Sequence, residues 1–216
     1  MGFRGDAAGF GRGGGMIWPV VLAAGLIGSL ASFQWGMRKF LTQPGGDNAG
    51  LKLIRVCGSA FALLHLAAIA ATPHVAARQA LGGACLYLSG LGLFWWAIRA
   101  NRGQPLSAAF SPDDPLHLVQ QGPYHVVRHP LYCSYLLVWI GGVVATDRLG
   151  LIATALAMGI VYARAAGMEE GKFARRALAA AYQKYRSRTG MFFPKPVKAL
   201  RSARTGRQRA AAASAR

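Results

Sequence analysis

The sequence is short of acidic residues and of cysteine. Of its 216 residues only seven are Asp or Glu, and charged residues of both signs make up 15%. Cys57, Cys85 and Cys133 all fall in apolar stretches and form no C-x-x-C pair, so neither a disulfide framework nor a zinc site is supported. His74 and His117 complete no metal-binding spacing either, and we expect no bound metal. There is also no internal repeat.

Apolar residues dominate the composition of the chain. They make up 53% of the chain, and the mean hydropathy of +0.28 is higher than a soluble domain of this length needs. Five apolar runs approach the ~20 residues of a membrane-spanning helix. The last two are separated by only three residues, which predicts a helical hairpin. The expected spans are residues 16–33, 51–71, 80–98, 131–146 and 150–165. We therefore predict an all-α polytopic membrane protein with about five transmembrane helices and a C-terminal amphipathic helix over residues 168–188.

Composition also suggests a division of the chain. We expect a disordered N-terminus (1–15), N-terminal transmembrane helices (16–99), a functional core (100–196) and a basic, disordered tail (197–216). Residues 100–127 form the only long polar connection between the apolar runs, and connections of that length are usually functional or disordered.

The formal net charge of +18 could indicate either nucleic acid or a membrane surface as partner. Because Lys and Arg gather in loops and in the tail between apolar runs, we expect anionic lipid headgroups, bound through the basic tail, and no nucleic acid. The positive-inside rule places the basic C-terminal end in the cytoplasm. With five spans, the N-terminus is then outside. High Ala, Gly and Arg content is compatible with a bacterial source, and hence with the inner (cytoplasmic) membrane.

The stretch Q-G-P-Y-H-V-V-R-H-P-L-Y at 121–132 concentrates groups that can hold a polar ligand. Arg128 is a permanent cation, His129 can donate or accept, and Tyr124 and Tyr132 carry hydroxyls on apolar rings. Pro130 suits the first turn of a helix and keeps His129 out of that helix. Arg128 and His129 should therefore lie at the positive N-terminal end of an apolar helix, where an anionic group is favoured.

Glu169 and Glu170 are adjacent where the last apolar run ends. They could cap the N-terminus of the amphipathic helix, or a carboxylate could pair with a cationic ligand group. The hairpin should bring them to the same surface as Arg128 and His129. Cationic and aromatic groups facing carboxylates would suit a zwitterion with an amino acid moiety.

These motifs together resemble a known superfamily. G-P-Y at 122–124, R-H-P-L-Y at 128–132, a hydrophobic hairpin, the Glu pair, Y-x-x-Y at 182–185 and F-P at 193–194 are similar to the C-terminal signature of the isoprenylcysteine carboxyl methyltransferases and phospholipid methyltransferases. The resemblance covers about residues 116–196. It implies an integral membrane enzyme that binds S-adenosyl-L-methionine in a cytoplasm-facing pocket and methylates a lipophilic small molecule or lipidated substrate.

The resemblance also implies site residues. Those expected to bind the cofactor are Leu116, His117, Leu118, Val119, Tyr124, His129, Pro130, Leu131, Tyr132 and Glu169. Those expected to act in catalysis are Arg128, Arg164 and Glu170. Glu169 would pair with the α-ammonium of the cofactor, and His129 would bind its α-carboxylate.

Two positions depart from the superfamily pattern. Ser134 stands where a Gly is usual, and Ala165 stands where a substrate-orienting Arg is expected, so Arg164 is the nearest replacement. The acceptor stays open between a carboxylate, an amine and a thiol. An amine or thiol would need a base, for which Glu170 or His125 could serve.

Two other functions are compatible with the sequence. Membrane NADPH-dependent steroid or enone reductases share a similar helical layout, although R-H-P with a Glu pair favours the methyltransferase. A nonenzymatic membrane protein could instead use the basic tail to dock a partner. Outside these motifs, we interpret His65 as a hydrogen-bonded core histidine, and Tyr182 and Tyr185 as packing residues.

Overall fold

The computed structural model describes residues 17–42, 49–101, 106–107, 117–174 and 178–196. The predictions for Leu116, for the N-terminus 1–15 and for the tail 197–216 lie outside these residues. Helices dominate the described chain, which confirms the all-α prediction. In chain order the elements are α1 (Ile17–Phe40), β1 (Leu41–Thr42), α2 (Ala49–Ala70), α3 (Ala77–Ala100), β2 (Leu106–Ser107), η1 (Gly122–His125), α4 (Pro130–Thr146), η2 (Leu149–Leu151), α5 (Ile152–Ala174) and α6 (Ala179–Arg188). The two short strands pair in parallel.

Four segments are long and apolar enough to cross a membrane. They correspond to α1, α2, α3 and the combined η2 and α5, with 21 to 25 residues each. Helix α4 is apolar but has only 17 residues. Large hydrophobic side chains project outward from this bundle, among them Val20, Leu63 and Leu88, each about two-thirds exposed. Lipid would cover such faces, so the structure has the character of an integral membrane protein with four long helices and a shorter fifth.

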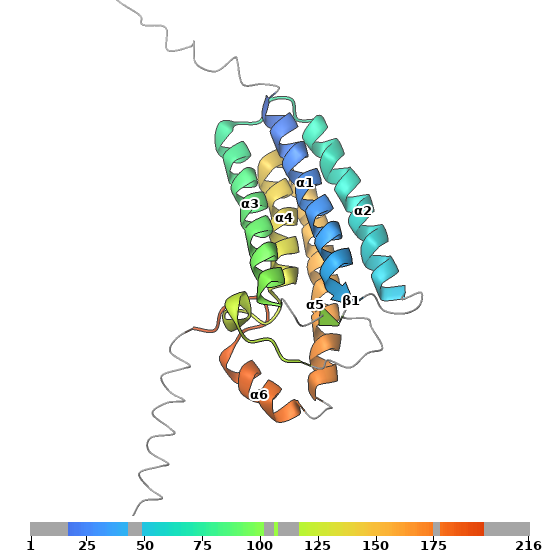
Figure 1. Ribbon diagram of the computed structural model, residues 1–216. Helices are drawn as coiled ribbons and strands as arrows, with labels where there is room; N and C mark the ends of the chain where they lie inside the picture. The colour runs from blue at the N-terminus through green and yellow to red at the C-terminus, as the bar shows by residue number, and fades with distance from the viewer. Residues whose placement is uncertain (1–16, 43–48, 102–105, 108–116, 175–177, 197–216) are drawn as a thin grey trace, which may run out of the picture.

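The five helices run alternately up and down (Figure 1). Helices α1, α3 and α5 end where α2 and α4 begin, and η1 and α6 lie beyond that end, which we call the site end. The tight turn at Asp147 and Arg148 lies at the opposite end, where Arg148 Nη2 donates to the Ala71 carbonyl over 2.9 Å. This alternation is the order that the apolar runs predicted.

Small residues let α3 and α4 approach closely. A Cβ added at Gly83 would lie 2.6 Å from Ala145 Cβ, and one at Gly90 would lie 2.7 Å from the Ser134 carbonyl oxygen. Ser134 itself is fully buried, and its hydroxyl donates to the Leu131 carbonyl over 2.6 Å. The residue that departs from the superfamily pattern therefore keeps the tight helix contact.

His65 is a buried core residue, as predicted. Its Nε2 lies 2.8 Å from Thr154 Oγ1, and its ring meets Trp139 edge-on at 5.3 Å. These contacts join α2, α4 and α5 inside the bundle.

Most helix ends lie within three residues of the predictions, but two regions differ by more. Helix α1 continues past residue 33 to Phe40, because Arg38 and Lys39 suit a helix C-terminus. The predicted amphipathic helix 168–188 is divided, since α5 runs through to Ala174 and α6 begins at Ala179. The Glu pair therefore lies in the last turns of α5, and its interpretation as an N-terminal cap is wrong. A helix C-terminus disfavours carboxylates, so both need cationic or hydrogen-bonding partners.

Candidate functional site

An extended backbone segment carries Arg128 and His129. The Arg128 N–H donates to the Gly190 carbonyl over 2.8 Å, and the His129 N–H donates to the Met191 carbonyl over 3.2 Å. His129 keeps a non-helical backbone (φ −124°, ψ 63°), and α4 begins at Pro130, as the sequence predicted. The residues just after α6 thus fix the two cations at the N-terminus of α4.

Five side chains meet there, and we call them the ionic cluster: Arg128, His129, Tyr132, Glu169 and Glu170. Arg128 Nε donates to Glu170 Oε1 over 2.8 Å, and its Nη1 donates to the Thr189 carbonyl. His129 bridges the two carboxylates, with Nε2 3.1 Å from Glu170 Oε1 and Nδ1 3.3 Å from Glu169 Oε2. The Tyr132 hydroxyl donates to Glu169 Oε1 over 2.7 Å. The hairpin therefore brings together the two motifs that the sequence analysis singled out.

The two glutamates have different surroundings. The side chain of Glu170 is only 8% exposed, and it contacts Arg128 and His129, with Arg186 Nε 3.7 Å from its second oxygen. The side chain of Glu169 is 24% exposed, and its described partners are His129 and Tyr132. Glu170 is thus held inside the protein, whereas Glu169 is the carboxylate that an incoming group can reach.

The charge of His129 follows from its neighbours. Burial lowers the pKa of His129, but hydrogen bonds and charge interactions with Glu169 and Glu170 outweigh burial, so the pKa is raised above its ordinary 6.5. In the protonated ring both nitrogens donate, as a bridge between two carboxylates requires. The sequence predicted that an anionic group is favoured at the positive N-terminal end of α4. In the structure, the carboxylates of Glu169 and Glu170 lie there.

Aromatic rings continue from the cluster into the bundle. The ring of Tyr132 stacks on His129 at 5.7 Å and on Tyr162 of α5 at 5.3 Å, with interplanar angles of 21° and 11°. Tyr162 was not predicted as a site residue. Its place seven residues before Glu169, two helical turns away on the same face of α5, is the signal that could have found it.

Tyr124 is anchored from two sides. Its buried hydroxyl accepts a hydrogen bond from Asn101 Nδ2 over 2.9 Å, and its carbonyl accepts one from the Tyr185 hydroxyl over 2.7 Å. Burial raises the pKa of Tyr124, so its phenol stays protonated. Gly122 precedes it with a left-handed φ of 59°, and a Cβ there would lie 2.9 Å from Ala100 Cβ. Sequence reasoning missed Asn101, since nothing in the chain order links it to Tyr124.

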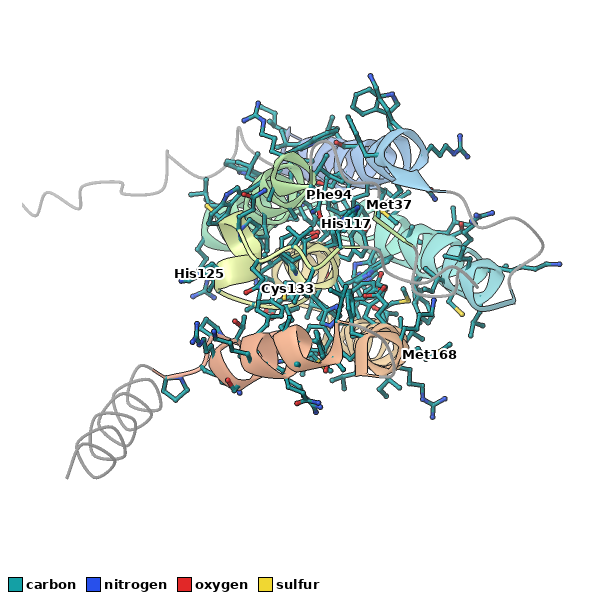
Figure 2. The ribbon with its side chains drawn as sticks, turned by 60° about the horizontal axis from the view of Figure 1, so that its bottom comes forward. Met37, Phe94, His117, His125, Cys133 and Met168 are labelled. Atoms are coloured by element: carbon teal, nitrogen blue, oxygen red, sulfur yellow. The ribbon has the colours of Figure 1, made fainter. Side chains whose placement is uncertain are left out.

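The remaining predicted residues lie around this centre. Pro130 is buried, Leu118, Val119 and Leu131 are half-buried, and His117 is exposed. Seen from the site end, His117 lies over the middle of the bundle and His125 at its edge (Figure 2). Arg164 is exposed on α5, one position from the buried Ala165, and no described contact joins it to the ionic cluster.

No group of three or more His, Cys, Asp or Glu that could hold a metal ion occurs among the residues that the structure describes. The ionic cluster itself consists of two carboxylates, one imidazole, one guanidinium and one phenol hydroxyl.

The ionic cluster lies at one end of a bundle whose outer faces carry exposed hydrophobic side chains, as in an integral membrane protein. Residues 78–181 match the family model described as phospholipid methyltransferase, and this part of the chain belongs to that family, within the isoprenylcysteine and phospholipid methyltransferase superfamily. The matched segment contains all five residues of the ionic cluster. A comparison with curated proteins finds no match. The protein is thus a membrane methyltransferase.

Proposed function

We propose that this enzyme transfers a methyl group from S-adenosyl-L-methionine to a lipophilic acceptor at the site end of the bundle. The observation that supports it most directly is the partly exposed carboxylate of Glu169, held in place by Tyr132 and His129 within the family-matched segment. Family members generally use this cofactor. It supplies a methyl group attached to a positively charged sulfur.

The described residues fit the chemistry of such a cofactor. Glu169 can pair with an α-ammonium group, and protonated His129 can donate to an α-carboxylate. The Asn101 amide oxygen and the Tyr135 hydroxyl are buried without a hydrogen-bond partner among the described residues, so donors and acceptors for a further polar molecule remain. Leu118 and Val119, which are half-buried, offer apolar surface for an adenine ring.

We assign different roles to the other charged residues. Arg128 and Glu170 satisfy each other and tie the start of α4 to the end of α5, so we propose that both are positioning residues for His129 and Glu169. Because Glu170 is already bound to two cationic groups, it is a poor general base. We propose no role for Arg164 in the cluster, since its side chain is exposed and makes no described contact there.

Charge distribution supports a cytoplasmic site. Among the described residues, the basic side chains in the last turns of helices at the site end are Arg38, Lys39, Arg99, Lys172, Arg186 and Arg188. Arg78 and Arg148 are at the opposite end, near the turns there. We propose on this basis that the site end faces the cytoplasm of a bacterial inner membrane, and that the acceptor, a lipid-borne carboxylate, amine or thiol, arrives through the bilayer.

Equilibrium binding of S-adenosyl-L-methionine to detergent-purified protein tests the proposal. Wild type should bind saturably, and both Glu169→Gln and His129→Ala should weaken binding at least tenfold, as the loss of a charge-assisted hydrogen bond of about 1.5–3 kcal/mol predicts. Asp147→Asn is the matched control, because it makes the same carboxylate-to-amide change at the opposite end of the bundle and should leave binding unchanged. A folded wild type that binds NADPH and not S-adenosyl-L-methionine would contradict the proposal.

A further inference from the structure

Tyr135 carries a hydroxyl that the fold does not use. The hydroxyl is shielded from solvent and has no hydrogen-bond partner among the described residues. Its ring is held firmly, with centroids 5.0 Å from Phe33, 5.6 Å from Tyr162 and 6.1 Å from Phe94. A phenylalanine would keep all these ring contacts. Packing therefore accounts for the ring and leaves the oxygen unexplained.

The position of this oxygen relates it to the site. Tyr135 lies one helical turn along α4 from Tyr132, further from the site end. Its ring also contacts the rings of Tyr132 and Tyr162, at centroid distances of 6.3 and 5.6 Å. The Tyr132 hydroxyl in turn donates to Glu169, a proposed cofactor residue. Tyr135 thus lies next to the side chains that would hold the cofactor, on the side toward the apolar interior.

We propose that the Tyr135 oxygen contacts the sulfonium methyl group of bound S-adenosyl-L-methionine. This inference rests on the proposed function. A lipophilic acceptor reaches the cofactor from the apolar interior, so the transferable methyl group has to face that side. The cationic sulfur makes the methyl C–H bonds polar, and an oxygen lone pair that has no other partner stabilises them.

The comparison of two ligands isolates this contact. S-adenosylhomocysteine lacks both the methyl group and the positive charge but keeps the amino acid and adenosine parts. Tyr135→Phe should weaken binding of S-adenosyl-L-methionine about two- to fivefold, as expected for a weak C–H···O contact. Binding of S-adenosylhomocysteine should stay unchanged. Calorimetric titration of each ligand into wild type and variant gives the ratio of the two dissociation constants.

Tyr87 provides a matched control. Its hydroxyl is likewise buried without a described partner, but its ring packs against Gly25 and Gly141 in the middle of the bundle. Tyr87→Phe should leave the ratio of the two dissociation constants as in wild type.

The outcomes separate this inference from the proposed function. One outcome is that wild type binds S-adenosyl-L-methionine while Tyr135→Phe weakens the binding of both ligands equally or of neither. In that case the inferred contact with the methyl group is contradicted and the proposed function stands. If wild type binds neither ligand, both fail together. The melting temperature of Tyr135→Phe without ligand should equal or exceed that of wild type, because an unpaired buried hydroxyl costs stability. A clear decrease would mean that the fold itself uses the hydroxyl, and would overturn the inference.

Discussion

The Arg128 guanidinium and the Glu170 carboxylate form a buried ion pair that joins the start of α4 to the end of α5. Their atoms approach to 2.8 Å, and the two side chains are 7% and 8% exposed. Glu170 lies near the C-terminus of its helix, where the backbone dipole opposes a negative charge, so Arg128 supplies compensation that the helix does not.

Breaking this pair should destabilise the protein strongly. Arg128→Ala leaves Glu170 buried with its main cationic partner removed, and we expect a loss of about 3–5 kcal/mol. The double replacement Arg128→Met with Glu170→Met should cost less than the sum of the single replacements Arg128→Met and Glu170→Met. In the double variant neither charge of the pair is left buried without the other. Thermal unfolding in detergent measures both, and Arg164→Ala, an exposed change on α5, serves as the control that should stay near wild type. Strict additivity in the double variant would contradict the ion pair.

The raised pKa of His129 predicts a pH dependence of stability. The protonated ring is favoured in the folded state, so its contribution is fully present below the unfolded pKa of 6.5 and is lost as the pH rises through the higher folded pKa. The melting temperature of wild type should therefore fall from pH 6 toward alkaline pH more steeply than that of His129→Asn. The exposed His125→Asn should follow the wild-type curve. Parallel curves for wild type and His129→Asn would argue against the charged bridge.

The tight contact between α3 and α4 predicts opposite effects for two glycines of one helix. Gly90→Ala places a methyl group 2.7 Å from the Ser134 carbonyl oxygen, so the helices have to separate, at a cost of about 1–3 kcal/mol. Gly92→Ala meets nothing within 4 Å and should leave stability unchanged or slightly higher. Melting temperatures of the two variants, purified side by side, check the difference.

The hydroxyl of Tyr185 should control how firmly α6 holds η1. Tyr185→Phe removes the 2.7 Å hydrogen bond to the Tyr124 carbonyl and leaves that buried carbonyl without this donor, at a cost of about 1–3 kcal/mol. Hydrogen exchange followed by mass spectrometry should show faster exchange in residues 179–188 and in η1, with the α3 core unchanged. Ser187→Ala, which removes only an exposed bond to the Lys184 carbonyl, should leave η1 protected.

Local signals in the sequence predicted much of this site. Pro130 marked the start of α4, the three-residue turn marked the hairpin, and the hairpin in turn predicted that Arg128 and Glu170 meet. These inferences succeeded because each depends on residues close in sequence or on helices of known length.

The missed features depend on distant pairings. Gly190 and Met191 accept hydrogen bonds from Arg128 and His129 through backbone carbonyls, which any residue type could supply. Asn101 donates a hydrogen bond to the Tyr124 hydroxyl from the other end of the polar connection, and no sequence pattern predicts this pairing. The end of α5 was misplaced because the change from apolar to charged residues at Met168 marks a change of surroundings, whereas the helix itself continues.

The shortness of α4 has a consequence for the lipid around it. Seventeen residues at about 1.5 Å each span roughly 26 Å, less than the ~30 Å hydrocarbon thickness of a typical bilayer. The ionic cluster begins where α4 begins, so in a flat bilayer of that thickness it would lie below the level of the headgroups. Hydrophobic mismatch of this kind draws the nearby leaflet inward. Lipid headgroups beside α4 would then descend to the depth of Glu169, so the ionic cluster would lie level with the polar surface of its own leaflet.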